Sequence, residues 1–194
     1  MADKKANALK DKIVLKSLEL AAAQGWQYVT LRDVAAAAEI SMADLYMAIE
    51  DKNDILVLFG RMVDRKVAEN IETPKEGDDL SARDLLFDIL MDRFDILNDH
   101  RDGVMAILES FKFDPKQSLC SLPHLCHSMG WMLEMAGIET SGVFGALKVA
   151  GMGGVYLKTL KTWMDDDNPD LSKTMAALDK TLGHAESAAN TFGF

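Results

Sequence analysis

The chain has 194 residues, of which 48% are hydrophobic and 27% are charged, and its formal net charge is −10. This composition excludes a disordered chain, and the acidic balance argues against a protein that coats nucleic acid indiscriminately, because phosphate contacts need Lys and Arg. Four prolines among many Ala, Leu and Met residues predict an all-α fold. With no apolar run long enough for a bilayer and no signal-peptide core, we expect a cytoplasmic protein without stable membrane insertion.

The amino-terminal stretch predicts a basic arm followed by a helix. Residues 1–16 hold five lysines against two aspartates, and a sequence-specific DNA-binding protein needs only such a local basic surface. Apolar residues at helical spacing predict a helix over residues 7–24, and Gly25 is well placed to end it.

Two capping signals in close succession predict a pair of short helices. Thr30 with Asp33 opens the first of them, and Ser41 with Asp44 opens the second. Because only two residues separate the predicted helices, they must turn sharply against each other. This spacing is typical of a helix-turn-helix motif.

The rest of the chain predicts a helical body. A long helix is expected over residues 53–71 with Asp51 as its cap, and the polar residues 72–80 are interpreted as a connector. Ser81 is expected to cap the next helix. Further helices are predicted around residues 104–111, from or through Pro123 to residue 137, and from Pro169 towards the carboxyl end.

Apolar stripes on the last two predicted helices indicate a bundle seam. The seam either packs within one chain or pairs two copies into a four-helix interface, and we favour the homodimer. Glycines crowded between residues 142 and 154 would let a partner helix approach closely. The predicted interface comprises Val143, Ala146, Ala150, Gly153, Leu157, Leu160, Leu171, Met175, Leu178 and Leu182.

Methionines and aromatic residues of the body predict an apolar pocket. Such residues are core by default, but twelve methionines suit a cavity that adapts to flexible ligands. We hypothesise a pocket for a small apolar or lipid-like ligand. Its candidate lining is Phe87, Met91, Phe94, Met105, Phe111, Trp131, Met135, Phe144 and Tyr156.

Residues 25–56 resemble the DNA-binding head of the TetR (tetracycline-repressor) family of transcriptional regulators. The resemblance rests on "GWQYVTLRDVAAAAEIS" and on an "LY" pair followed six residues later by Lys52. It implies a TetR-like fold with a three-helix helix-turn-helix head over residues 1–52. Residues 53–194 would form a helical ligand-binding and dimerisation domain, and double-stranded operator DNA would be the partner.

The same resemblance implies roles for individual head residues. Thr30 and Tyr46 would hydrogen-bond backbone phosphates, and Lys52 would place its charge on a phosphate. Arg32 lies where it could touch the DNA backbone. The residues expected to face the major groove are Ser41, Met42, Ala43, Asp44 and Met47.

The head departs from the family pattern in its turn and its charge. Glu39 stands where the family usually has glycine, and residues 1–60 hold seven Lys and Arg against nine Asp and Glu. Asp44 could accept from a cytosine amino group, and Met42 or Ala43 could touch a thymine methyl. No arginine is available for the guanine contact that most sequence-specific proteins use.

Residues 151–182 are similar to the closing region of the coenzyme Q biosynthesis accessory protein family, which has a TetR-like fold. The similarity rests on a "VY" pair, a tryptophan seven residues on and an acidic turn. It implies an alternative function, a lipid-binding accessory protein that does not bind DNA. The tail "GHAESAANTFGF" has no Lys or Arg, which is a poor membrane signal.

Residues 120–127 hold a further cluster of side chains of the types that bind metals. The segment "CSLPHLCH" brings Cys120, His124, Cys126 and His127 together, but their spacing matches no standard zinc pattern. One of the histidines could contact the ligand. We expect no metal, no cofactor and no catalytic residue set, and therefore no enzyme.

Overall fold

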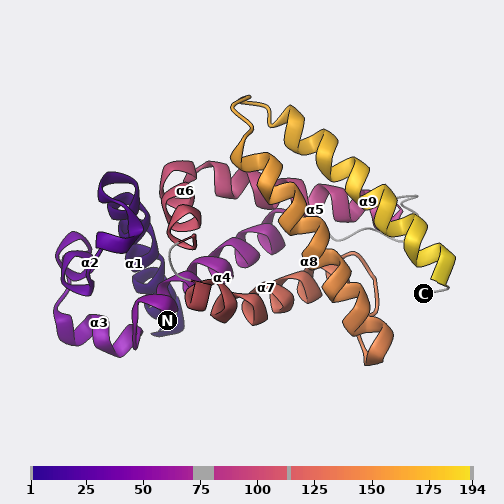
Figure 1. Cartoon of the computed structure of the whole chain (residues 1–194). Coiled ribbons are helices and arrows are strands. Elements are labelled where there is room, and N and C mark those ends of the chain that lie inside the picture. Colours follow the sequence, from indigo (N-terminus) through magenta and orange to yellow (C-terminus); the bar gives the residue numbers. More distant parts are fainter. Residues whose placement is uncertain (1, 72–80, 113–114, 193–194) are drawn as a thin grey trace. The chain divides into compact units, whose positions relative to one another are not determined.

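A computed structural model describes the backbone of residues 2–71, 81–112 and 115–192, with side chains over the same ranges except residues 2–5, 115–120 and 192. Every regular element in these ranges is a helix, which confirms the predicted all-α fold (Figure 1). The chain divides into two compact units. The first unit comprises residues 1–65 and 96–124, and the second unit comprises residues 66–95 and 125–194.

The helices follow one another with short connections. The amino-terminal elements are α1 (Ala2–Gln24), the 3-10 turn η1 (Trp26–Tyr28), α2 (Leu31–Ala37), α3 (Met42–Ala48) and α4 (Lys52–Asn70). The later helices are α5 (Ala82–Asn98), α6 (Arg101–Ser110), α7 (Pro115–Met135), α8 (Gly142–Met164) and α9 (Ser172–Phe192). The predicted connector over residues 72–80 lies outside the described residues.

Local capping explains where the short helices begin and end. Gly25 follows α1 with φ 84°, a left-handed conformation that glycine adopts readily. Thr30 and Asp33 form a complete capping box at the start of α2, and the Ser41 side chain accepts from the backbone N–H of Asp44 at the start of α3. The predicted helix-turn-helix starts are confirmed.

Side-chain caps also set the next two helix starts. Asp51 Oδ1 accepts from the backbone N–H groups of Asn53 and Asp54 at 2.6 and 3.2 Å, so it caps α4 as predicted. Ser81 Oγ accepts from the backbone N–H of Asp84 at 3.1 Å and caps α5.

Of the two alternatives at Pro123, the helix that runs through it is confirmed, because Pro123 lies inside α7. This helix begins at Pro115, where a first-turn proline loses no helical hydrogen bond. One predicted helix start is wrong. The last helix begins at Ser172 and not at Pro169. Two carboxylates cap this start: Asp170 Oδ1 accepts from the Ser172 backbone N–H at 3.2 Å, and the buried Asp166 carboxylate, distant in sequence, accepts from the Thr174 backbone N–H at 2.8 Å.

The core of the first unit forms where α1 contacts η1, α2 and α6. A Cβ placed on Gly103 in α6 would lie 2.6 Å from the carbonyl oxygen of Leu18, so α6 approaches the α1 backbone closely. The side chains buried in this core include Ile13, Val14, Leu18, Ala21, Trp26, Val34, Ala35, Ala38, Leu45, Val104 and Ile107. The apolar faces predicted for the first two helices supply most of them.

The second unit is built on the pair α8 and α9, which pack side by side (Figure 1). Phe94 of α5 stacks on Tyr156 of α8 with 5.4 Å between the ring centroids. Trp163, Leu171 and Leu178 are almost completely buried. Among the described residues, no helix combines the length and hydropathy that crossing a membrane requires.

Candidate functional site

The outward side of α3 is the most exposed apolar surface of the first unit. We name it the α3 outer face and define it as Met42, Ala43, Tyr46 and Met47. Tyr46 and Met47 are 75% and 85% exposed, whereas Leu45, which precedes them, is buried. The seven-residue helix is thus anchored on one side and presents large side chains to solvent on the other.

Hydrogen bonds of the two caps hold the residues beside this face. Thr30 Oγ1 donates to Asp33 Oδ2 at 2.6 Å, and hydrogen bonds from Thr30 lower the pKa of the Asp33 carboxyl. Ser41 Oγ donates to Asp44 Oδ2 at 2.7 Å. One oxygen of the Asp44 carboxylate is therefore engaged locally.

The side chain of Lys52 contacts Trp26. Its Nζ donates to the carbonyl oxygen of Trp26 and lies 4.4 Å from the centroid of the Trp26 ring. Burial lowers the pKa of Lys52. The amino group thus ties the start of α4 to the turn after α1, and its contact with a phosphate stays a prediction.

The exposed residues around the α3 outer face include both basic and acidic side chains, and more of those named below are acidic. Arg32 is exposed on α2, while Glu39, Glu50 and Asp51 are exposed on the acidic side. Glu39 adopts φ 54°, the left-handed conformation for which the family usually has glycine. Its carboxylate lies 3.7 Å from Lys12 Nζ, an exposed pair of small energetic value.

Most predicted DNA-binding residues share an accessible surface. Lys52 alone is half-buried, and the remaining eight are exposed, namely Thr30, Arg32, Ser41, Met42, Ala43, Asp44, Tyr46 and Met47. Their contacts with DNA stay a prediction.

The second unit contains an apolar cleft of about 550 Å³, within the size range of small-molecule sites. It is lined by α5, α7, α8, α9 and Ile138, which lies in the connection between α7 and α8. The lining residues are Ala82, Arg83, Leu86, Leu133, Ile138, Leu147, Lys148, Gly151, Met152, Leu182, Ala185, Glu186, Ala188 and Ala189.

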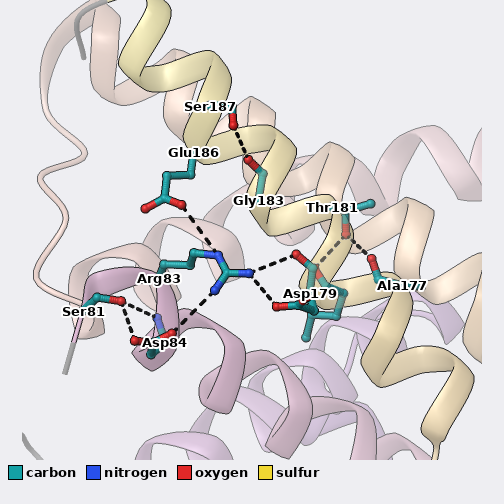
Figure 2. A network of polar contacts seen from close by, with 10 residues as sticks. Ser81, Arg83, Asp84, Ala177, Asp179, Thr181, Gly183, Glu186 and Ser187 are labelled. Carbon is teal, nitrogen blue, oxygen red and sulfur yellow. Dashed lines mark hydrogen bonds and ion pairs between the residues drawn. The ribbon is translucent and has the colours of Figure 1, made fainter.

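The charged side chains of the cleft differ in their pairing. Arg83 Nη2 donates to Asp179 Oδ1 at 2.5 Å, and its guanidinium lies 3.7 Å from Glu186 and 3.6 Å from Asp84 (Figure 2). Lys148 has no ion pair or hydrogen bond with any described residue. The arginine is therefore neutralised by its neighbours, and the lysine is not.

The predicted pocket residues do not line this cleft, and three kinds of environment account for them. Met91, Phe94 and Tyr156 are buried core residues, while Trp131 and Phe144 are largely exposed. The half-buried members are Phe87, Met105, Phe111 and Met135. The actual lining is rich in alanine and glycine, which make room for a ligand, and that small-residue pattern was the available signal.

The predicted dimer residues separate into exposed and buried sets. Val143, Ala146, Ala150 and Leu157 are exposed along one side of α8, which we name the α8 outer face, and Met175 is exposed on α9. Leu160 is half-buried. The residues already covered by their own chain are Gly153, Leu171, Leu178 and Leu182, so they are placed in the protomer core instead.

The cysteine and histidine residues of α7 gather no metal site within the described side chains. His124, Cys126 and His127 are exposed, and Trp131 Nε1 donates to His127 Nε2 at 3.1 Å. The side chain of Cys120 lies outside the described residues. Among those described, no three His, Cys, Asp or Glu side chains converge.

Comparison with known proteins identifies the fold. No protein-family model matches the chain, and no curated protein matches it. A TetR transcriptional regulator from Nitrosomonas europaea is similar at a TM-score of 0.72 and 22% identity, over 91% of this chain and 97% of that chain. A TetR transcriptional regulator from Rhodococcus sp. RHA1 gives 0.67 and 15%, over 94% and 97%.

A third solved structure includes a ligand. Thermus thermophilus FadR, a TetR-family transcriptional repressor in complex with lauroyl-CoA, is similar at a TM-score of 0.57 and 13% identity, over 91% of this chain and 93% of that chain. The whole-chain similarity to these structures covers both the two capped helices and the helical second unit. The chain therefore has the fold of the TetR-family transcriptional regulators.

Proposed function

We propose that the protein is a cytoplasmic, ligand-responsive transcriptional regulator that binds operator DNA as a homodimer and has no catalytic role. The observation that carries the proposal is the exposed α3 outer face, supported by two intact caps in a helix-turn-helix arrangement. Because solvent-exposed large apolar groups are uncommon in a cluster, Tyr46 and Met47 indicate a surface that meets a partner.

The chemistry of the α3 outer face suits the major groove despite its lack of cations. Methionine and alanine side chains can contact thymine methyl groups, and the Tyr46 hydroxyl can donate to a phosphate. Arg32 is exposed on α2, and Lys10 and Arg61 line the same hollow as Tyr46 and Met47. We therefore expect sequence-selective binding with a smaller electrostatic share than basic regulators have.

DNA binding is tested by fluorescence anisotropy with labelled DNA from upstream of the protein's own gene. The wild-type protein should bind it saturably, and at least tenfold more tightly than a shuffled duplex of equal length. Met47→Glu, which places a negative charge on the α3 outer face, should abolish the preference. Ala68→Glu is the matched control, because Ala68 is exposed on α4 away from the predicted contacts. Equal binding to both duplexes, or none, would refute DNA recognition.

A ligand-binding role is supported by the apolar cleft of the second unit. The similar fold of FadR, solved with lauroyl-CoA, is consistent with an apolar, lipid-like ligand here. A ligand can alter DNA affinity only if it binds two arrangements of the protein differently. Coupling of about 1–3 kcal/mol suffices for a useful switch.

Homodimerisation is supported by the α8 outer face and by the glycines beside it. A Cβ placed on Gly151 or Gly154 would meet no atom of the described chain within 4 Å. Gly151 also lines the apolar cleft, whereas the single chain gives no steric reason for glycine at position 154. Close approach of a second helix would supply one, and we place the two-fold interface on the α8 outer face and Met175.

The alternative of a lipid-binding accessory protein is not favoured, because the solved structures named above are transcriptional regulators. The DNA titration separates the two functions. An accessory protein would bind lipid and show no preference between the upstream and shuffled duplexes.

A further inference from the structure

We propose that the cleft of the second unit binds an amphiphile with one anionic group, held by Lys148, and an apolar chain that occupies the rest of the cleft. The inference rests on the ligand-responsive function proposed above and specifies the chemistry of its ligand. It follows from the pairing of the charges around the cleft and from the residues that line it.

The two cations of the lining differ in the carboxylates that surround them. Arg83 is surrounded by three carboxylates, those of Asp84, Asp179 and Glu186, so it has little capacity left for an anionic ligand (Figure 2). Lys148 is engaged by no described residue. In a chain with a net charge of −10, an unpaired cation beside an apolar cleft is the one local feature that attracts an anion.

The remainder of the lining fits a flexible hydrocarbon chain. Beyond Arg83, Lys148 and Glu186, every lining residue is aliphatic, a methionine or a glycine. Among the described side chains, no aromatic ring lines the cleft, so these residues offer no surface for stacking a planar ligand. Hydrophobic burial would hold the chain, and a charge-assisted hydrogen bond to Lys148 would set its direction.

The Arg83 network also orients the ligand. Its three carboxylates repel a second anion at their side of the cleft, where Ala82, Ala185 and Glu186 lie near the guanidinium. The anionic group is therefore directed towards α8, and the end of the chain towards α9. A carboxylate and a phosphate would satisfy Lys148 equally, and the test distinguishes them.

The experiment is isothermal titration calorimetry of the full chain, without DNA, using decanoate, decyl phosphate, 1-decanol and decylamine. The wild-type protein should bind at least one of the two anions about tenfold or more tightly than decanol. Lys148→Met removes the charge and keeps an unbranched apolar side chain only one atom shorter, so the variant should bind decanol as the wild type does and lose the preference for the anion. The control Lys158→Met, on an exposed part of α8 outside the cleft, should keep the preference for the anion.

Four results would overturn the proposal. They are equal or tighter binding of decanol, tighter binding of decylamine, an equal loss in Lys158→Met, and no binding of any probe. Which anion binds more tightly identifies the headgroup as a carboxylate or a phosphate. Because DNA is absent, a failure here refutes the ligand assignment and leaves the anisotropy test of DNA binding independent.

Discussion

The α3 outer face and the α8 outer face are both exposed and apolar, yet they are built for different partners. The α3 face presents long side chains on a helix of seven residues, and its neighbours Thr30 and Ser41 satisfy the backbone through caps. The α8 face presents small and aliphatic residues along a helix of 23 residues, with Gly151 and Gly154 beside it. Flexible side chains suit the uneven groove of a duplex, and small ones suit the close packing of two helices.

The largest effect is expected from a charge on the α8 outer face. Ala150→Glu would place two like charges near the two-fold axis, which costs several kcal/mol in an interface. Light scattering should then give the mass of a monomer. Ala68→Glu, an equally exposed helical alanine on α4, should remain dimeric. A dimeric Ala150→Glu protein would show that the α8 face does not form the interface.

A smaller effect is expected from the α1–α6 contact that supports the first unit. Gly103→Ala introduces a Cβ that would lie 2.6 Å from the carbonyl oxygen of Leu18. Such overpacking should lower the free energy of unfolding by about 1–3 kcal/mol in urea denaturation. Gly60→Ala, where the new Cβ meets no atom within 4 Å, should instead raise it slightly. Equal effects at both glycines would contradict the close approach of the helices.

The cap of α2 should contribute less to the free energy of unfolding than the contact between α1 and α6. Thr30→Ala removes the acceptor for the Asp33 backbone N–H and should destabilise the protein by about 1 kcal/mol in thermal denaturation. Thr30→Ser keeps the hydroxyl and should restore most of the loss. If serine and alanine were equally destabilising, the threonine methyl group would matter more than the cap.

The smallest effect is expected at the turn between α2 and α3. Glu39 has φ 54°, where a side chain is strained, so Glu39→Gly should raise the free energy of unfolding by about 0.5 kcal/mol. Glu39→Ala removes the same charge and the contact with Lys12 but keeps the Cβ, and it should bring no such gain. A gain with alanine would attribute the effect to charge.

Local signals made the helix starts predictable. Thr30, Ser41, Asp51 and Ser81 each act on backbone groups two or three residues away, so their patterns are visible in the sequence. The start of α9 was missed in part because Asp166 caps it across eight residues, through a turn whose path the sequence does not specify.

The candidate site was predictable only where it is local. The exposed residues of α3 follow from the motif and the helical period, but the bond from Lys52 to Trp26 joins segments 26 residues apart. The cleft was missed because aromatic and methionine residues such as Phe94 and Tyr156 fill the core, and the space lies beside small residues. Sequence patterns predict which residues are buried, but they do not predict where the packed side chains leave a cavity.

If the proposed function holds, a ligand in the cleft must change the affinity of the protein for DNA. Anisotropy of the upstream duplex is titrated with protein before and after saturation with whichever decyl anion binds more tightly by calorimetry. The account predicts that the affinity for DNA changes by about fivefold to 150-fold in the wild type, and does not change in Lys148→Met at the same ligand concentration. An unchanged affinity in the wild type, with the cleft shown to be full by calorimetry, would contradict it.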